Sequence, residues 1–144
     1  KNIEWMKAHL KSNAHSIQLF TEDVRTLIPH VAKQSVGGIA FEPYMGKPLK
    51  GHEQKPFLVS QAKELSELYT EALRSCSQLL KKDGVVVAIF PQFRLKGEWI
   101  TTMNQHDIRA AGFTITPLSK KGDALLYHRP GQHVGRLIYR LQKV

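Results

Sequence analysis

A continuous apolar run at residues 85–90 follows a long segment with helical periodicity, and this arrangement constrains the fold most strongly. The run is rich in β-branched side chains, which is typical of a strand buried on both faces of a parallel sheet. Residues 60–82 carry apolar side chains on one helical face, with Ser60 as the predicted N-cap and Gly84 as the predicted end. Parallel strands need such helical crossovers, so the pattern favours an α/β fold.

The end of the chain departs from this alternation. A second predicted helix at residues 100–111 comes before the last strands. Residues 124–127 and 136–141 then read as strands, and Pro130 and Gly131 mark a turn in the connection between them. We therefore expect a mostly parallel sheet that is closed by an antiparallel hairpin. Further predicted strands are residues 17–20, 36–41 and 113–118.

The N-terminal region gives weaker signals. Residues 1–12 read as the end of an amphipathic helix, with Asn13 as its stop. Residues 24–33 predict a short helix that is broken near Pro29. Because the sequence starts inside a helical pattern, we expect it to begin within a longer domain.

The chain is strongly basic, with a formal net charge of +9 and a pI of about 9.8. Such a chain is attracted to phosphate backbones at long range. Lys47, Lys50 and Lys55 form one loose cluster and are the candidate nucleic-acid contacts. The alternative is that these three lysines are solvated loop charges, and the sequence leaves both open.

Cysteine usage and hydropathy indicate a cytoplasmic protein. The one cysteine, Cys76, cannot form an intrachain disulfide and falls at an apolar-periodic position, so it is predicted to be a small buried side chain. No apolar run approaches the roughly 20 residues that span a bilayer. No signal peptide is visible, and no membrane partner is expected.

Common catalytic signatures are absent from the sequence. It has no phosphate-binding glycine loop followed by Lys and Ser or Thr, and no Gly-x-Ser-x-Gly nucleophile elbow. None of the seven histidines has the spacing of a zinc site, so no metal is predicted and each histidine is expected to be solvated or locally hydrogen-bonded.

One long loop remains as the candidate site. Residues 42–56 are rich in proline and glycine and directly follow the buried strand at residues 36–41. In an open α/β sheet, ligands bind at the carboxyl ends of the strands, which is where this loop begins. The alternative is a structural loop with a packing tyrosine.

The loop sequence Phe-Glu-Pro-Tyr-Met-Gly-Lys-Pro at residues 41–48 resembles a motif of S-adenosylmethionine-dependent amino-methyltransferases, Asp/Asn/Ser-Pro-Pro-Tyr/Phe/Trp. It is most similar to the branch that methylates the exocyclic amine of tRNA guanosines, which has Glu-Pro-Tyr-Leu-Gly-Pro-like loops. Residues 125–136, Leu-Leu-Tyr-His-Arg-Pro-Gly-Gln-His-Val-Gly-Arg, resemble the closing segment of the same branch. The resemblance covers nearly the whole chain.

This resemblance implies an enzyme that transfers a methyl group from S-adenosylmethionine to a base amine of RNA, with tRNA guanine as the expected target. Glu42 and Pro43 would hold the amine, and Tyr44 would stack on a base that has left its own stack. Asp23 and Phe41 are assigned to the cofactor side, and the alternative for Asp23 is a solvated turn residue or a helix cap. Phe41 stands where the family carries a side-chain acceptor, so Asp at this position is expected to raise the activity of a weakened enzyme.

The resemblance also implies that residues 1–144 form the C-terminal part of a Rossmann-like class I methyltransferase domain, without its N-terminal cofactor-binding strands. The isolated chain is therefore expected to bind cofactor weakly and to be inactive. Residues 17–20 would lose their neighbouring strands and would either detach, pair with residues 36–41, or pair with another chain in a homo-oligomer.

Two other functions stay open at this point. One is the same chemistry on adenine or cytosine of DNA, because any domain that selects the substrate would lie upstream. The other is a non-catalytic methyltransferase-like subunit that binds nucleic acid, which the missing acceptor at Phe41 favours.

Overall fold

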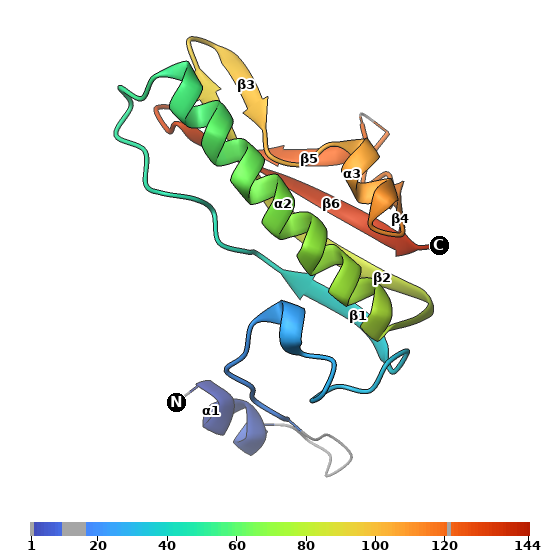
Figure 1. Ribbon diagram of the computed structural model, residues 1–144. Coiled ribbons are helices and arrows are strands. Elements are labelled where there is room, and N and C mark those ends of the chain that lie inside the picture. The colour runs from blue at the N-terminus through green and yellow to red at the C-terminus, as the bar shows by residue number, and fades with distance from the viewer. Residues whose placement is uncertain (1, 10–16, 121) are drawn as a thin grey trace.

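A computed structural model describes residues 2–9, 17–120 and 122–144 (Figure 1). A six-stranded sheet forms the body of the described chain, with strand order β1-β2-β6-β4 and with β3 paired to β2 and β5 to β6. The elements are α1 (Asn2–His9), η1 (Val24–Thr26), β1 (Val36–Phe41), α2 (Lys55–Leu79), β2 (Leu80–Leu95), β3 (Glu98–Thr101), α3 (Gln105–Ala110), β4 (Phe113–Thr116), β5 (Ala124–Tyr127) and β6 (Val134–Lys143).

The predicted α/β class and the antiparallel closing hairpin are confirmed, but the sheet is not mostly parallel within the described residues. Only β1 and β2 pair in parallel, and α2 is the crossover between them. All other pairs are antiparallel. Two of these pairs follow from connections without a helix: β2 turns directly into β3 at Lys96 and Gly97, both with positive φ, and a short loop joins β5 to β6.

Helix α2 is longer at its start than the sequence indicated. It begins at Lys55 rather than Ser60, with Pro56 in its first turn, where a missing N–H costs nothing. It ends at Leu79 because Leu80 already pairs with Val36 of β1, and Gly84 lies inside β2.

The predicted helix at residues 100–111 is wrong in its first part. Ile100 pairs with Phe93 as part of β3, so this stretch extends the sheet. Helix α3 starts only after Asn104, whose side chain accepts a hydrogen bond from the N–H of Asp107 at 2.9 Å.

The core lies between α2 and one face of the sheet (Figure 1). Tyr69 from α2, Phe90 from β2 and Tyr139 from β6 pack together at its centre, with ring centroids 5.1 and 6.1 Å from Phe90. Cys76 is buried there as predicted, and burial raises the pKa of its thiol to about 11.

The opposite face of the sheet is partly exposed in the described part of the chain, although Pro91 and Phe93 near the end of β2 are fully buried. Along β2 the side chains of Val86, Ala88 and Phe90 are buried, whereas Val87 is 37% exposed, so the prediction of burial on both faces is wrong here. Leu125 and Tyr127 of β5 lie on this partly exposed face and are 41% and 43% exposed. Both η1 and α3 contact α2 instead.

Residues 17–20 form no strand, contrary to the prediction. A strand needs a neighbour for its backbone groups, and the outer edge of β1 pairs with no described strand. The helix predicted at the N-terminus is present as α1, while its predicted stop at Asn13 lies outside the described residues. At residues 24–33, where a short helix broken near Pro29 was predicted, η1 is followed by a turn that contains Pro29.

Candidate functional site

The candidate loop leaves the carboxyl end of β1, as predicted from the sequence. Phe41 is the last residue of that strand, and its ring packs edge-on against Phe90 with centroids 6.3 Å apart. Phe41 therefore points to the core beneath α2. An Asp introduced at this position would place a carboxylate against the aromatic core, so we now expect Phe41→Asp to destabilise the chain rather than to restore a site.

Tyr44 is presented to solvent by a fixed backbone. Its side chain is 61% exposed, while its carbonyl oxygen accepts a hydrogen bond from the hydroxyl of Tyr69 at 2.5 Å. Tyr69 is fully buried on α2, and this burial raises the pKa of its hydroxyl above the ordinary value of a tyrosine. The hydroxyl therefore stays protonated and remains a donor. The core thus fixes the backbone of Tyr44, while the Tyr44 ring lies in solvent.

The loop after Tyr44 is also attached to α2. The backbone N–H of Lys47 donates to the side-chain oxygen of Gln61 at 2.8 Å. Gly46 has φ +92°, and a Cβ there would lie 3.1 Å from both Gln61 and Leu65. Only glycine combines this backbone conformation with such a close approach to the helix.

Glu42 joins the loop to the closing strand of the sheet. Its carboxylate accepts a 2.7 Å hydrogen bond from Nε of Arg136, which is 94 positions away in the sequence. Both side chains point to the partly exposed face, since Phe41 and Leu137 face the core and side chains alternate along a strand. Sequence reasoning did not include Arg136 among the site residues. The signals in the sequence were its position at the end of the Arg-Pro-x-Gln-x-Val-x-Arg segment and its place in a basic cluster near the C-terminus.

A first cavity of about 450 Å³ lies beside these residues. It is bounded by the loop after Tyr44 on one side and by the start of β6 on the other. Arg136, the partner of Glu42, is part of its wall. Its lining residues are Met45, Gly46, Lys47, Pro48, Leu49, Gln132, His133, Val134 and Arg136.

A carboxylate closes the far end of the loop. The backbone N–H groups of Lys50 and Gly51 donate to the two oxygens of Glu53 at 2.5 and 2.9 Å. The hydrogen bond from Lys50 is the main reason that the pKa of Glu53 is lowered. Of the predicted lysines, Lys47 lines the first cavity and Lys55 lines a second one, whereas Lys50 lines neither.

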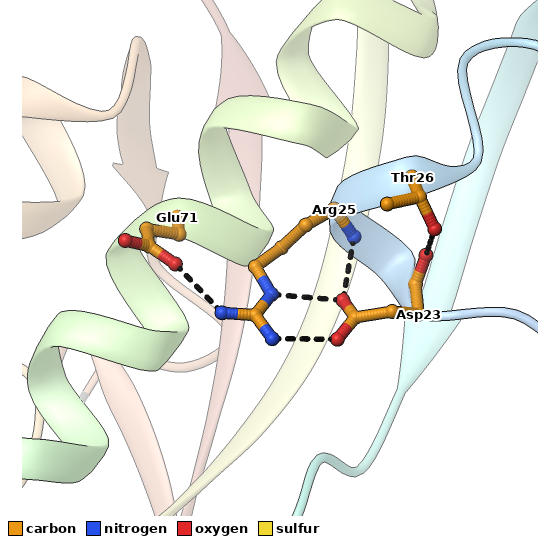
Figure 2. Close-up of polar contacts among 4 residues, drawn as sticks. All are labelled: Asp23, Arg25, Thr26 and Glu71. Atoms are coloured by element: carbon orange, nitrogen blue, oxygen red, sulfur yellow. Dashed lines mark hydrogen bonds and ion pairs between the residues drawn. The ribbon is translucent and has the colours of Figure 1, made fainter.

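Asp23 lies away from the loop, at the start of η1 (Figure 2). One of its oxygens accepts from the backbone N–H and from Nε of Arg25, both at 2.9 Å, and the other accepts from the guanidinium at 2.7 Å. Arg25 also donates to Glu71 of α2 at 3.2 Å. Asp23 therefore acts as a helix cap here, and its contact with the adenine of a cofactor stays a prediction.

Titration of Asp23 offers a direct check of this arrangement. The side-chain hydrogen bonds from Arg25 are the largest cause that lowers the pKa of Asp23 to about 2. Because this value lies below the unfolded value of about 3.9, the contact stabilises the chain above pH ~4, and this contribution is lost as the pH falls towards 2. Carbon-detected NMR should give the low pKa, and Arg25→Ala should return it towards 3.9. An unchanged pKa in that variant would contradict the pairing.

The described residues offer no group of three or more His, Cys, Asp or Glu side chains that could hold a metal ion. In the same part of the chain, no helix is both long and apolar enough to cross a membrane.

No protein-family model and no curated protein matches this sequence, whereas several solved structures match its fold. One is a candidate DNA modification methylase from Thermus thermophilus, with 16% identity and a TM-score of 0.59 over 85% of this chain and 52% of that chain. The same protein was also solved in complex with S-adenosyl-L-methionine, with 16% identity and a TM-score of 0.53 over 85% and 51% of the two chains.

A second protein also has this fold. It is the 1,6-didemethyltoxoflavin-N1-methyltransferase of Burkholderia thailandensis with bound 1,6-didemethyltoxoflavin and S-adenosylhomocysteine, with 15% identity and a TM-score of 0.54 over 98% of this chain and 56% of that chain. The chain thus spans about half the length of the solved structures that it matches. At these identities the likeness concerns the fold alone, and the chain shares its α/β fold with about half of each of these proteins.

Proposed function

We propose that this chain is the base-recognising part of an S-adenosylmethionine-dependent methyltransferase that acts on an exocyclic base amine of RNA, with tRNA guanine as its substrate in the cytoplasm. The observation that carries the proposal is the exposed ring of Tyr44, held at the carboxyl end of β1 by the buried Tyr69. A free aromatic face at this position suits a base that has been flipped out of its stack.

The chemistry of an amine nucleophile explains the remaining features of the loop. The lone pair of an exocyclic amine is delocalised into the ring, so an acceptor near its hydrogens makes it a better nucleophile. In our proposal the backbone carbonyl of Glu42 accepts a hydrogen bond from the amine, and Pro43 stiffens the turn so that this acceptor is positioned before reaction. The carboxylate of Glu42 is engaged by Arg136 and instead fixes the loop.

The cofactor would supply the methyl group, and Asp23 and Phe41 remain the residues that we propose for its side of the site. Asp23 binds Arg25 with both oxygens, and Phe41 packs on Phe90. Our proposal therefore rests on the base side of the site, at Glu42, Pro43 and Tyr44.

The experiment is a methyl-transfer assay with the full-length protein, labelled S-adenosylmethionine and three substrates: an unmodified tRNA transcript, single-stranded RNA and double-stranded DNA. We expect label on tRNA, and nucleoside mass spectrometry should identify the product as N2-methylguanosine. Calorimetry with S-adenosylmethionine reports separately whether the cofactor binds. Cofactor binding with no transfer to any substrate would contradict an enzymatic role.

A second candidate function is methylation of adenine or cytosine in DNA, which the likeness to the candidate DNA modification methylase favours. It predicts label on DNA and none on tRNA in the same assay. The third candidate is a non-catalytic nucleic-acid-binding subunit, which the packing of Phe41 into the core favours. It predicts nucleic-acid binding without methyl transfer.

We also propose that a second copy of the chain can pair with the outer edge of β1. This edge has no partner among the described strands, and such edges accept further strands. Gly37 has open space around a Cβ, so Gly37→Lys would add a charge to the edge without a clash. A concentration-dependent dimer in light scattering that this variant abolishes is the expected result, and a strict monomer would exclude the pairing.

A further inference from the structure

A second cavity of about 540 Å³ adjoins the first one, and His133 lines both. Three segments meet around it: the end of the candidate loop with the start of α2, the turn between β2 and β3, and the segment that leads into β6. Its lining residues are Gly51, His52, Glu53, Gln54, Lys55, Arg94, Leu95, Lys96, Glu98 and His133.

The cationic side chains of this cavity outnumber its carboxylates. Lys55, Arg94 and Lys96 supply three permanent positive charges, and none of them forms an ion pair with a described carboxylate. The lining also includes Glu53 and Glu98. Glu53 is already neutralised in part by the N–H groups at the end of the loop, so its charge opposes a bound anion less than a free carboxylate would.

The backbone around the cavity is held in place by specific contacts. The N–H of Arg94 donates to the carbonyl of His133 at 2.8 Å, and the Arg94 guanidinium lies 5.6 Å from the centre of the Trp99 ring. Gly51 approaches His133 so closely that a Cβ would lie 2.4 Å from its ring nitrogen. These contacts join the three segments, so the backbone already brings their cationic residues around one cavity.

We propose that this second cavity binds a backbone phosphate of a single-stranded stretch of the nucleic-acid substrate, next to the nucleotide whose base enters at Tyr44. The inference rests on the proposed function for the identity of the strand. It adds Arg94 and Lys96 to the phosphate contacts, neither of which lies near the lysine cluster in the sequence. Phosphate is the expected group because guanidinium and ammonium donors recognise it together, and the shared wall at His133 places it beside the first cavity.

The test is fluorescence anisotropy with a labelled 12-nucleotide single-stranded RNA of mixed sequence, and with the matching DNA, at several salt concentrations. The full-length protein is compared with the double variant Arg94→Gln/Lys96→Gln. Each lost phosphate contact should lower the slope of log affinity against log salt by about 0.7. At about 0.1 M salt the two together should weaken binding roughly 20-fold.

The matched control is Lys81→Gln/Lys82→Gln, which removes the same charge from the opposite end of β2, where both side chains are exposed. It should leave the affinity within about twofold of the wild type, since phosphate contacts act locally. Lys96→Gln alone keeps the contact of Arg94 with Trp99. This single variant therefore tests the site if the double variant does not fold. Glu98→Gln should tighten binding, because it removes a carboxylate from the lining.

Equal weakening in the test and control variants would overturn the phosphate site and leave only a general effect of charge. The methyl-transfer assay fails or succeeds independently of this result. Binding that depends on Arg94 and Lys96 without any methyl transfer would support the phosphate site and contradict the enzymatic proposal. Methyl transfer by the wild type, together with an unchanged RNA affinity in the double variant, would support the enzymatic proposal and contradict the phosphate site.

Discussion

Phe90→Ala should lower the free energy of unfolding by about 3–5 kcal/mol, which is a large part of the roughly 5–15 kcal/mol that stabilises a typical domain. Phe90 is fully buried at the centre of the sheet and contacts the rings of Phe41, Tyr69 and Tyr139. Truncation removes its apolar area from the core and leaves a cavity that these neighbours cannot fill. Urea unfolding followed by circular dichroism measures the change.

Leu125→Ala is the matched control for this prediction. Leu125 lies on β5 and is 41% exposed on the face of the sheet that no described helix covers. Its replacement should cost only about 1 kcal/mol, since a large part of the side chain stays in water in the folded chain. Equal losses in both variants would mean that the partly exposed face is buried in solution and that the one-sided core is wrong.

The same contrast explains what the sequence could and could not predict about the fold. The β-branched run at residues 85–90 correctly predicted the central strand, and the periodicity before it predicted α2. Burial on both faces could not be inferred, since it depends on what packs against the second face. The strand predicted at residues 17–20 was wrong for a similar reason. Their composition suits a strand, but pairing requires a neighbour that the described chain does not provide.

Those parts of the site that depend on the order of elements along the chain were predictable from the sequence. Those that depend on contacts between distant residues were not. The position of Glu42, Pro43 and Tyr44 at the carboxyl end of a strand was clear from the sequence, but the predicted burial of that strand was wrong, because β1 is an edge strand of the described sheet and none of its residues is buried. The pairing of Glu42 with Arg136 joins residues far apart in the chain, so spacing carries no information about it. Arg94 and Lys96 were missed because their segment reads as the approach to a helix and not as a hairpin.

Tyr44→Ala should lower the kcat/KM of methyl transfer by roughly 5- to 150-fold, because stacking of a base on an aromatic ring contributes about 1–3 kcal/mol. The ring is 61% exposed and its backbone is held by Tyr69, so removing the side chain should leave the fold intact. Initial rates with a tRNA transcript give the change in activity, and the unfolding midpoint in urea gives the change in stability.

Tyr44→Phe is the control that separates stacking from hydrogen bonding. It keeps the aromatic face and removes only the hydroxyl, so its activity should stay within a few-fold of the wild type if stacking is the main contribution. A loss as large as that of the alanine variant would mean that the hydroxyl contacts the substrate directly. Wild-type rates in Tyr44→Ala would show that the base binds elsewhere, and the exposed ring of Tyr44 could then no longer support the proposed function.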